Sequence, residues 1–131
     1  MTTRKPYVLL LEEDARLAEA YGRRLEMRHC RVKIVRTVAE AKRRMRPAVP
    51  DVLVLDAATQ DGQGMALIQW LRSHPTTLTL PILVLAARTD RSLIREARVA
   101  GVTAYLMKTQ VSPRVLAERV VHSLVEKGRT A

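Results

Sequence analysis

Four charged residues lie at the ends of short apolar runs, and their types suggest one site for metal and phosphoryl chemistry. Glu12 and Glu13 follow the first run, Asp56 follows the third, and Lys108 follows the last. Carboxylates without sulfur or imidazole partners suit a hard divalent cation such as Mg²⁺ or Mn²⁺. A lysine that faces such carboxylates suits a phosphoryl oxygen. The four residues can share a site only if the fold brings the ends of these runs together.

Five runs have the length and composition of strands in a parallel sheet. Continuous apolar runs fit strands that are buried on both faces, and their Val and Ile content favours strand over helix. Four runs are largely apolar, and the second alternates polar with apolar residues. The runs are Tyr7–Leu11, Arg31–Val35, Asp51–Leu55, Pro81–Leu85 and Thr103–Met107.

Five further stretches, which alternate with the runs, have helical spacing of their apolar residues. Asp14, Thr37 and Asp90 stand at predicted N-caps, and Gly101 stands where a glycine ends a helix. Pro113 suits the first turn of the last helix. The predicted helices are one that follows Asp14, then Val38–Arg46, Gly64–Arg72, Arg91–Ala100, and one that opens at Ser112-Pro113.

The strict alternation of strand and helix predicts an α/β fold: a doubly wound parallel sheet of five strands flanked by five helices. Ligands of such sheets lie at the carboxyl ends of the strands, where the four charged residues stand. The 131 residues are expected to form a single domain, 1–131, with loose ends at about 1–5 and 128–131.

Four motifs in register resemble the receiver domain of two-component response regulators, and together they cover nearly the whole chain. They are Val8–Asp14, Asp51–Asp56 with Asp61–Gly64, Pro81–Arg88, and Ala100–Lys108. The resemblance implies the flavodoxin-like receiver fold with strand order 2-1-3-4-5, the order of chemotaxis-regulator-like receivers. It also implies a role in phosphorelay signal transduction, without enzymatic activity of its own.

The resemblance implies a phosphoacceptor and a metal site. Asp56 is expected to accept a phosphoryl group from a histidine kinase or phosphotransfer protein. Glu12, Glu13, Asp56 and the backbone carbonyl of Ala58 are expected to bind Mg²⁺. The cation is needed because phosphate and carboxylate repel each other. Since the family normally has Asp in the acidic pair, the longer glutamates are expected to weaken the binding of an ion that requires near-ideal octahedral geometry.

Four more residues are implied to contact the phosphoryl group or to respond to it. Lys108 and the backbone amide of Ala87 are the expected phosphoryl contacts, and Ala86 and Tyr105 occupy the switch positions. The family has a hydroxyl where Ala86 stands, so phosphorylation is expected to switch this domain poorly, with Tyr105 already turned inward. Thr109 replaces the family's usual proline, and a trans peptide bond is expected before it.

These departures keep a second function open. In the first interpretation the chain is a receiver that accepts phosphate at Asp56, as Asp56 and Lys108 favour. In the second it is a pseudo-receiver, a protein-interaction module that keeps the fold but acts independently of phosphorylation. The glutamate pair, Ala86 and Thr109 favour the second interpretation.

The net charge of +10 is the unusual feature of the composition. Such a charge can attract acidic proteins, nucleic acids or anionic membranes. No recognition-helix motif or series of stacking aromatics accompanies it, so nucleic-acid binding is not expected. No apolar stretch is long enough to span a membrane, and the single cysteine fits a cytoplasmic protein.

A second copy of the chain or another partner is expected to bind one particular face. The resemblance suggests the face formed by the fourth helix, the fifth strand and the fifth helix. Arginine suits ion pairs at such interfaces. The arginines on this face are Arg91, Arg95, Arg98 and Arg119.

Overall fold

The computed structural model describes residues 4–59 and 62–130, with side chains in the last helix as far as Glu126. Five strands and five helices alternate along these residues. The strands are β1 (Tyr7–Leu11), β2 (Arg31–Val35), β3 (Val52–Asp56), β4 (Ile82–Ala86) and β5 (Ala104–Met107). The helices are α1 (Ala15–Met27), α2 (Val38–Met45), α3 (Gly64–Arg72), α4 (Arg91–Val99) and α5 (Pro113–Thr130).

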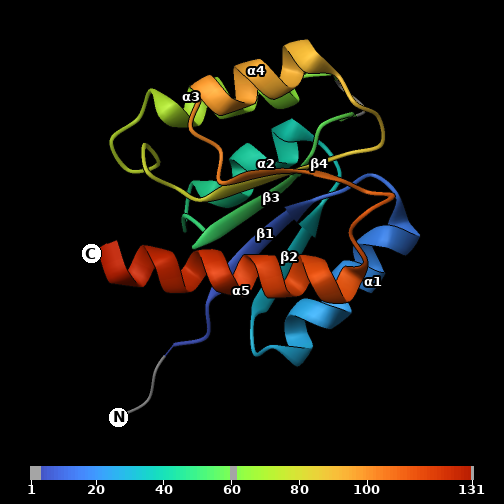
Figure 1. Cartoon of the computed structure of the whole chain (residues 1–131). Coiled ribbons are helices and arrows are strands. Elements are labelled where there is room, and N and C mark those ends of the chain that lie inside the picture. The colour runs from blue at the N-terminus through green and yellow to red at the C-terminus, as the bar shows by residue number, and fades with distance from the viewer. Residues whose placement is uncertain (1–3, 60–61, 131) are drawn as a thin grey trace.

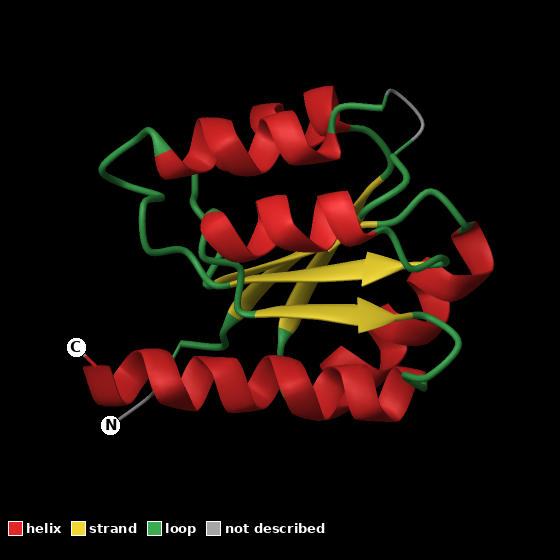
Figure 2. Cartoon of the chain, turned by 45° about the horizontal axis from the view of Figure 1, so that its top comes forward, coloured by secondary structure: helices red, strands yellow, loops and turns green. Residues whose placement is uncertain are grey.

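The strands form one parallel sheet in the order β2-β1-β3-β4-β5, which confirms the predicted fold and strand order. The sheet lies between two layers of helices (Figures 1 and 2). Strands β1 and β3 lie in its interior, and every residue of β1 and β3 is buried. Because all strands run the same way, their carboxyl ends meet at one edge.

Side chains of the strands point alternately to the two helical layers. Val8 and Leu10 of β1 pack with α1 and α5 on one face, whereas Leu9 and Leu11 pack with α2 and α3 on the other. Helix α4 lies beside α3 on this second side (Figure 1). Among the helices within residues 4–59 and 62–130, none has the length and apolar character to cross a lipid bilayer.

The predicted helix boundaries rest on local hydrogen bonds that the structure contains. The side chain of Asp14 accepts the N–H groups of Arg16 and Leu17, and the predicted caps Thr37 and Asp90 each accept one N–H in the same way. Gly101 has a φ of 71°, the left-handed conformation expected after a helix. Three helices therefore begin where the sequence predicted, and α4 ends close to the predicted residue.

Several boundaries were wrong by one residue. Strands β3 and β4 both begin and end one residue later than predicted, so Asp56 and Ala86 are the last residues of their strands. The reason at β3 is that Asp51 is used before the strand: its side chain accepts the N–H of Tyr7 at 2.7 Å, and strand pairing starts at Val52. Strand β5 begins at Ala104, and α2 and α4 end one residue early.

The C-terminal end also differs from the prediction. Helix α5 continues to Thr130, so residues 128–130 are helical where a loose end was expected. Residues 4–6 have no regular structure, although the carbonyl of Pro6 accepts the N–H of Arg31 at 2.8 Å. Residues 1–3 and 131, and Gln60 and Asp61 in the loop after β3, lie outside the described residues.

Arg72 connects two loops at the amino-terminal edge of the sheet. Its guanidinium donates hydrogen bonds to the carbonyls of Thr77, Leu78, Ala100 and Gly101, at 2.8–3.1 Å. Burial lowers the pKa of Arg72, and no carboxylate pairs with it among the described residues. The contacts join the α3–β4 loop to the α4–β5 turn, and they support α4, in which only Ala97 is buried.

Candidate functional site

Asp56 lies at the carboxyl end of β3, in the interior of the sheet. It pairs in register with Leu85 of β4, and only 3% of its surface is exposed. Its Oδ1 accepts the backbone N–H of Ala58 at 3.0 Å. This bond holds the carboxylate at the strand end, and its second oxygen, Oδ2, is directed to Lys108.

Lys108 brings two carboxylates together. Its Nζ lies 3.2 Å from Oδ2 of Asp56, and 2.9 Å and 3.1 Å from Oε1 and Oε2 of Glu12. Its backbone N–H donates to the carbonyl of Ala86 at 2.8 Å, which continues the β4–β5 pairing by one residue. Three residues predicted from separate strand ends therefore meet as a single charged group.

Glu12 is fully buried, whereas its neighbour Glu13 is exposed. The backbone N–H of Glu12 donates to the carbonyl of Val35, and its Oε2 accepts the N–H of Asp14 at 3.1 Å. Oε1 is close to the ammonium of Lys108 but receives no well-directed hydrogen bond. The predicted acidic pair is therefore divided: one carboxylate reaches the site, and the other faces solvent.

Burial and charge oppose each other in this group. Burial raises the pKa of Glu12, as does the nearby carboxylate of Asp56, although the hydrogen bond from Lys108 lowers it. Burial lowers the pKa of Lys108, but the hydrogen bond to Glu12 and the charge of Asp56 outweigh it, and the net shift is upward. Lys108 is therefore charged at neutral pH, as a group that balances two carboxylates must be.

The carboxylates at this edge match the ligands that Mg²⁺ prefers. Within residues 4–59 and 62–130, no three His, Cys, Asp or Glu side chains converge closely enough to form a metal site. Mg²⁺, however, usually keeps several waters and takes one or two carboxylates. Glu12 and Asp56 supply two, and both also pair with the ammonium of Lys108. The chemistry of the residues therefore fits the ion, with Glu12 and Asp56 as the carboxylates in reach.

The other predicted residues lie on the β4–β5 side of the site. Ala86 is buried at the end of β4, and Ala87 is exposed directly after it. The half-buried side chain of Tyr105 lines a small cavity of about 10 Å³ with residues of β3, β4, α3 and α4, and it also lines the groove between α4 and β5. Its hydroxyl oxygen is buried and has no hydrogen-bond partner. The ring thus points into the protein, and burial raises the pKa of the phenol.

The expected trans geometry is also present, because the described residues contain no cis peptide bond. Thr109 therefore follows Lys108 through a trans bond. Lys108 lies in the turn directly after β5 and contacts Asp56 without a proline after it.

Comparison with known proteins identifies the family of this chain. The family model of the response regulator receiver domain matches residues 8–121. The chain belongs to this family. The matched residues include every predicted site residue of the receiver domain, from Glu12 to Lys108.

Relatives of this receiver domain are transcriptional regulators. The phosphate regulon transcriptional regulatory protein PhoB of Rhizobium meliloti is 29% identical over 112 residues, which are 86% of this chain and 49% of PhoB. The transcriptional regulatory protein KdpE of Mycobacterium tuberculosis is 34% identical over 101 residues, 77% of this chain and 43% of KdpE. The chain thus spans about half the length of these relatives or less.

Solved structures give the same assignment. The non-phosphorylated HemR receiver domain from Leptospira biflexa has a TM-score of 0.81 and 28% identity, and the match covers 92% of this chain and 94% of that one. A CheY-like response regulator receiver domain protein from Methanospirillum hungatei has a TM-score of 0.87 over 98% of this chain and all of its own. At 20% identity, the second match concerns the fold alone. The chain is a response regulator receiver domain of two-component signal transduction, as its sequence predicted.

Proposed function

We propose that the receiver domain accepts a phosphoryl group on Asp56 from the phosphohistidine of a histidine kinase or phosphotransfer protein. The observation that carries this proposal is the contact of Lys108 with Asp56 at 3.2 Å in a buried setting. An oxygen of Asp56 forms a bond to phosphorus while the phosphorus–nitrogen bond of the donor breaks. The electron pair of that bond leaves with the imidazole, which takes up a proton from water.

The residues around Asp56 favour this transfer through charge and position. Lys108 offsets negative charge where the carboxylate and the phosphoryl oxygens meet. The hydrogen bond from Ala58 to Oδ1 fixes the carboxylate and leaves Oδ2 as the attacking oxygen. The amide of Ala87 is on an exposed residue at the same edge, where it can donate to a phosphoryl oxygen.

Mg²⁺ is part of the proposal. Glu12, Asp56 and the backbone carbonyl of Ala58 would hold the ion, and Glu13, which faces solvent in the structure, would have to turn toward the site to be the further ligand that the sequence predicts. When bound, the ion neutralises negative charge on the phosphoryl group. The longer glutamate side chains make its binding weaker than in a receiver with two aspartates.

The test is covalent labelling. The protein is incubated with Mg²⁺ and a small phosphodonor, and its intact mass is measured. We expect the mass of one phosphoryl group to be added to the wild type and to Asp51→Asn, a matched change just before the same strand. Asp56→Asn should remain unlabelled, and labelling of this variant at equal stoichiometry would refute the assignment.

Ala86 supports the second candidate, a pseudo-receiver that acts by protein interaction without phosphorylation. Position 86 has no hydroxyl to bond a phosphoryl group, and the hydroxyl of Tyr105 is already buried without a partner, which supports a conformation that phosphorylation changes little. The same labelling experiment separates the candidates. A wild type that stays unlabelled under conditions that label an ordinary receiver favours the pseudo-receiver.

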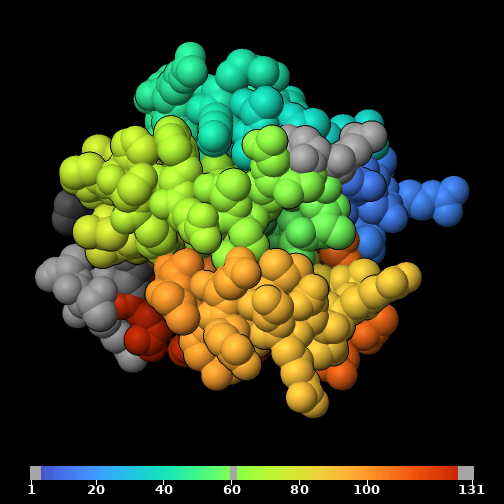
Figure 3. Space-filling view, turned by 90° about the horizontal axis from the view of Figure 1, so that it is seen from above, coloured from blue at the N-terminus to red at the C-terminus, as the bar shows by residue number. Residues whose placement is uncertain are grey.

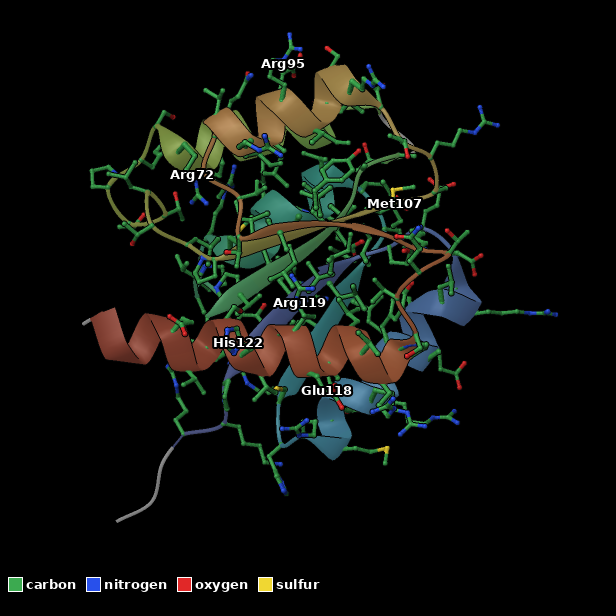
Figure 4. The ribbon with its side chains drawn as sticks, in the orientation of Figure 1. Arg72, Arg95, Met107, Glu118, Arg119 and His122 are labelled. Carbon is green, nitrogen blue, oxygen red and sulfur yellow. The ribbon has the colours of Figure 1, made fainter. Side chains whose placement is uncertain are left out.

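We also propose that a second copy or another partner binds the face formed by α4, β5 and α5. Arg91, Arg95, Arg98 and Arg119 are exposed there, and Arg95 points away from the sheet (Figure 4). A groove of about 330 Å³ between α4 and β5 is lined by Ile94, Arg98 and Met107 among others. Light scattering at low and high salt tests self-association, and a monomer at every concentration leaves only the version with a different partner.

We further propose that the receiver domain is cytoplasmic and has no enzymatic activity of its own.

A further inference from the structure

Helices α2 and α3 together carry an exposed aromatic and basic surface on the side of the protein away from α1 and α5. We define the α2–α3 surface as Lys42, Arg43, Arg46, Trp70 and His74. Figure 3 looks onto this side of the molecule, where α2 and α3 lie next to each other, with α4 beyond α3. The proposed phosphoacceptor site uses none of these residues.

Trp70 is the centre of this surface. About 37% of the residue is exposed, which is unusual for the only tryptophan of a chain that has few aromatic residues. The Nζ of Lys42 lies over the indole, 5.0 Å from the ring centroid. The imidazole of His74 lies 4.6 Å away, and its Nδ1 is 2.7 Å from the carbonyl of Trp70. The indole is therefore held in place from two sides, although much of it remains in contact with solvent.

The charge around Trp70 is one-sided. Arg43 and Arg46 are exposed and make no ion pair with another described residue. The segment from Gly64 to Leu80, which contains α3, has no acidic residue at all. The one acidic residue of α2, Glu40, is used by the backbone N–H of Arg36. The basic groups of the α2–α3 surface thus have no carboxylates of their own among the described residues.

We propose that the α2–α3 surface binds an acidic segment of a partner protein, with Trp70 as the apolar anchor. Tryptophan and arginine dominate the binding energy of protein interfaces. An anchor that is already fixed loses little entropy on binding. The unpaired basic groups select a partner that places carboxylates beside an apolar side chain.

The same geometry disfavours a nucleic acid as the occupant. Nucleobases bind to such surfaces by stacking on an open aromatic face. Lys42 lies over one face of the indole, and the tilted ring of His74 lies 4.6 Å from it, so less of the ring is open to a stacked base. Contact is left to the exposed part of the ring, which suits aliphatic side chains.

The experiment uses the fluorescence of Trp70 itself, which is the only tryptophan in the protein. The full chain is titrated at low salt with a short synthetic peptide of Glu and Leu, with a Lys and Leu peptide of the same pattern, and with a single-stranded oligonucleotide. We expect a saturable blue shift of the emission with the acidic peptide only. The double variant Arg43→Gln with Arg46→Gln should weaken binding about tenfold.

The matched control is Arg24→Gln with Arg28→Gln, which removes the same charge from the exposed end of α1 in the other helical layer. It should leave the affinity unchanged within about twofold. Equal weakening by both double variants would mean attraction by net charge alone and would overturn the proposal. So would the absence of a blue shift, tighter binding of the oligonucleotide, or a shift that depends only on the concentration of the protein itself.

Discussion

The two sides of the candidate site differ in the chemistry of their side chains. On the β1–β3 side, Glu12 and Asp56 are buried and share the ammonium of Lys108 at 2.9–3.2 Å. On the β4–β5 side, Ala86 has no polar side-chain atom, and the hydroxyl of Tyr105 is buried without a partner. In the proposed function, the first side supplies the charges for phosphoryl transfer, and the second has no hydroxyl at position 86 to bond the phosphoryl group. We therefore expect acceptance of a phosphoryl group and the response to it to depend on separate residues.

Removal of Lys108 should have the largest effect. In Lys108→Ala, Glu12 and Asp56 remain buried and face each other without a cation. Breaking a buried ion pair in this way typically costs about 3–5 kcal/mol of unfolding free energy. Urea denaturation at pH 7 measures the loss, with Lys33→Ala on the exposed face of β2 as the control. A loss no larger than that of the control would show that Lys108 does not balance the two carboxylates.

Ala86→Thr should change the other side of the site. The new hydroxyl can hydrogen-bond the phosphoryl group, and a charge-assisted bond of this kind contributes about 1.5–3 kcal/mol. The ratio of active to inactive conformations on phosphorylation should therefore rise roughly 10- to 150-fold. Amide hydrogen exchange across residues 86–108, with and without beryllofluoride, measures the change.

The substitution Val99→Thr in α4 is the control for this experiment, because it adds a hydroxyl at a position that is 85% exposed and outside the proposed site. It should leave the wild-type response unaltered. A large response of the wild type, equal to that of Ala86→Thr, contradicts the idea that the missing hydroxyl limits switching.

Replacing Glu12 and Glu13 with the shorter aspartate should strengthen the binding of Mg²⁺. The double variant Glu12→Asp with Glu13→Asp shortens both side chains by one methylene group, to the aspartate that the resemblance leads us to expect at these positions. Binding of Mg²⁺ should tighten about tenfold, which corresponds to about 1.4 kcal/mol. Titration calorimetry measures the affinity, and Glu26→Asp on the exposed face of α1 is the control. An unchanged affinity would argue against side-chain length as the cause of weak binding.

Tyr105→Phe should have the smallest effect and the opposite sign. It removes a buried hydroxyl that has no partner, so the unfolding free energy should rise by about 1 kcal/mol at pH 7. Burial raises the pKa of Tyr105 above its usual 10.0. The unfolded chain therefore ionises first as the pH passes 10, and the wild type loses stability that the phenylalanine variant keeps.

Denaturation at pH 7 and above pH 10 tests both parts of this prediction. The advantage of Tyr105→Phe should widen at the higher pH. A variant that is clearly less stable than the wild type at pH 7 would mean that the hydroxyl contributes a favourable contact.

Local patterns in the sequence determined the elements of this fold. The five strands follow from apolar runs, and Asp14, Thr37, Asp90 and Gly101 mark helix boundaries through hydrogen bonds or backbone angles within a few residues. Such interactions are short-range, so the neighbouring residues are sufficient to predict them. The ends of β3 and β4 were missed by one residue because the pairing of neighbouring strands sets them.

The sequence analysis assigned both Glu12 and Glu13 to the metal site, whereas in the structure only Glu12 reaches it. Successive side chains at a strand end point to opposite sides, which separates the two carboxylates. Which of them reaches Asp56 depends on the face that β1 turns to α1 and α5, and only the packed sheet fixes that face. The same holds for Lys108, whose distance to the carboxylates depends on the β4–β5 pairing.

Two further arrangements were decided by the tertiary structure alone. Arg72 ends α3 and donates not only to the loop that follows this helix but also to the carbonyls of Ala100 and Gly101 after α4. Trp70 stays partly exposed beneath Lys42 of another helix. In both cases a partner lies far away in the chain. Periodicity and capping describe one element at a time, whereas the distance between elements is set by how their side chains fill the core.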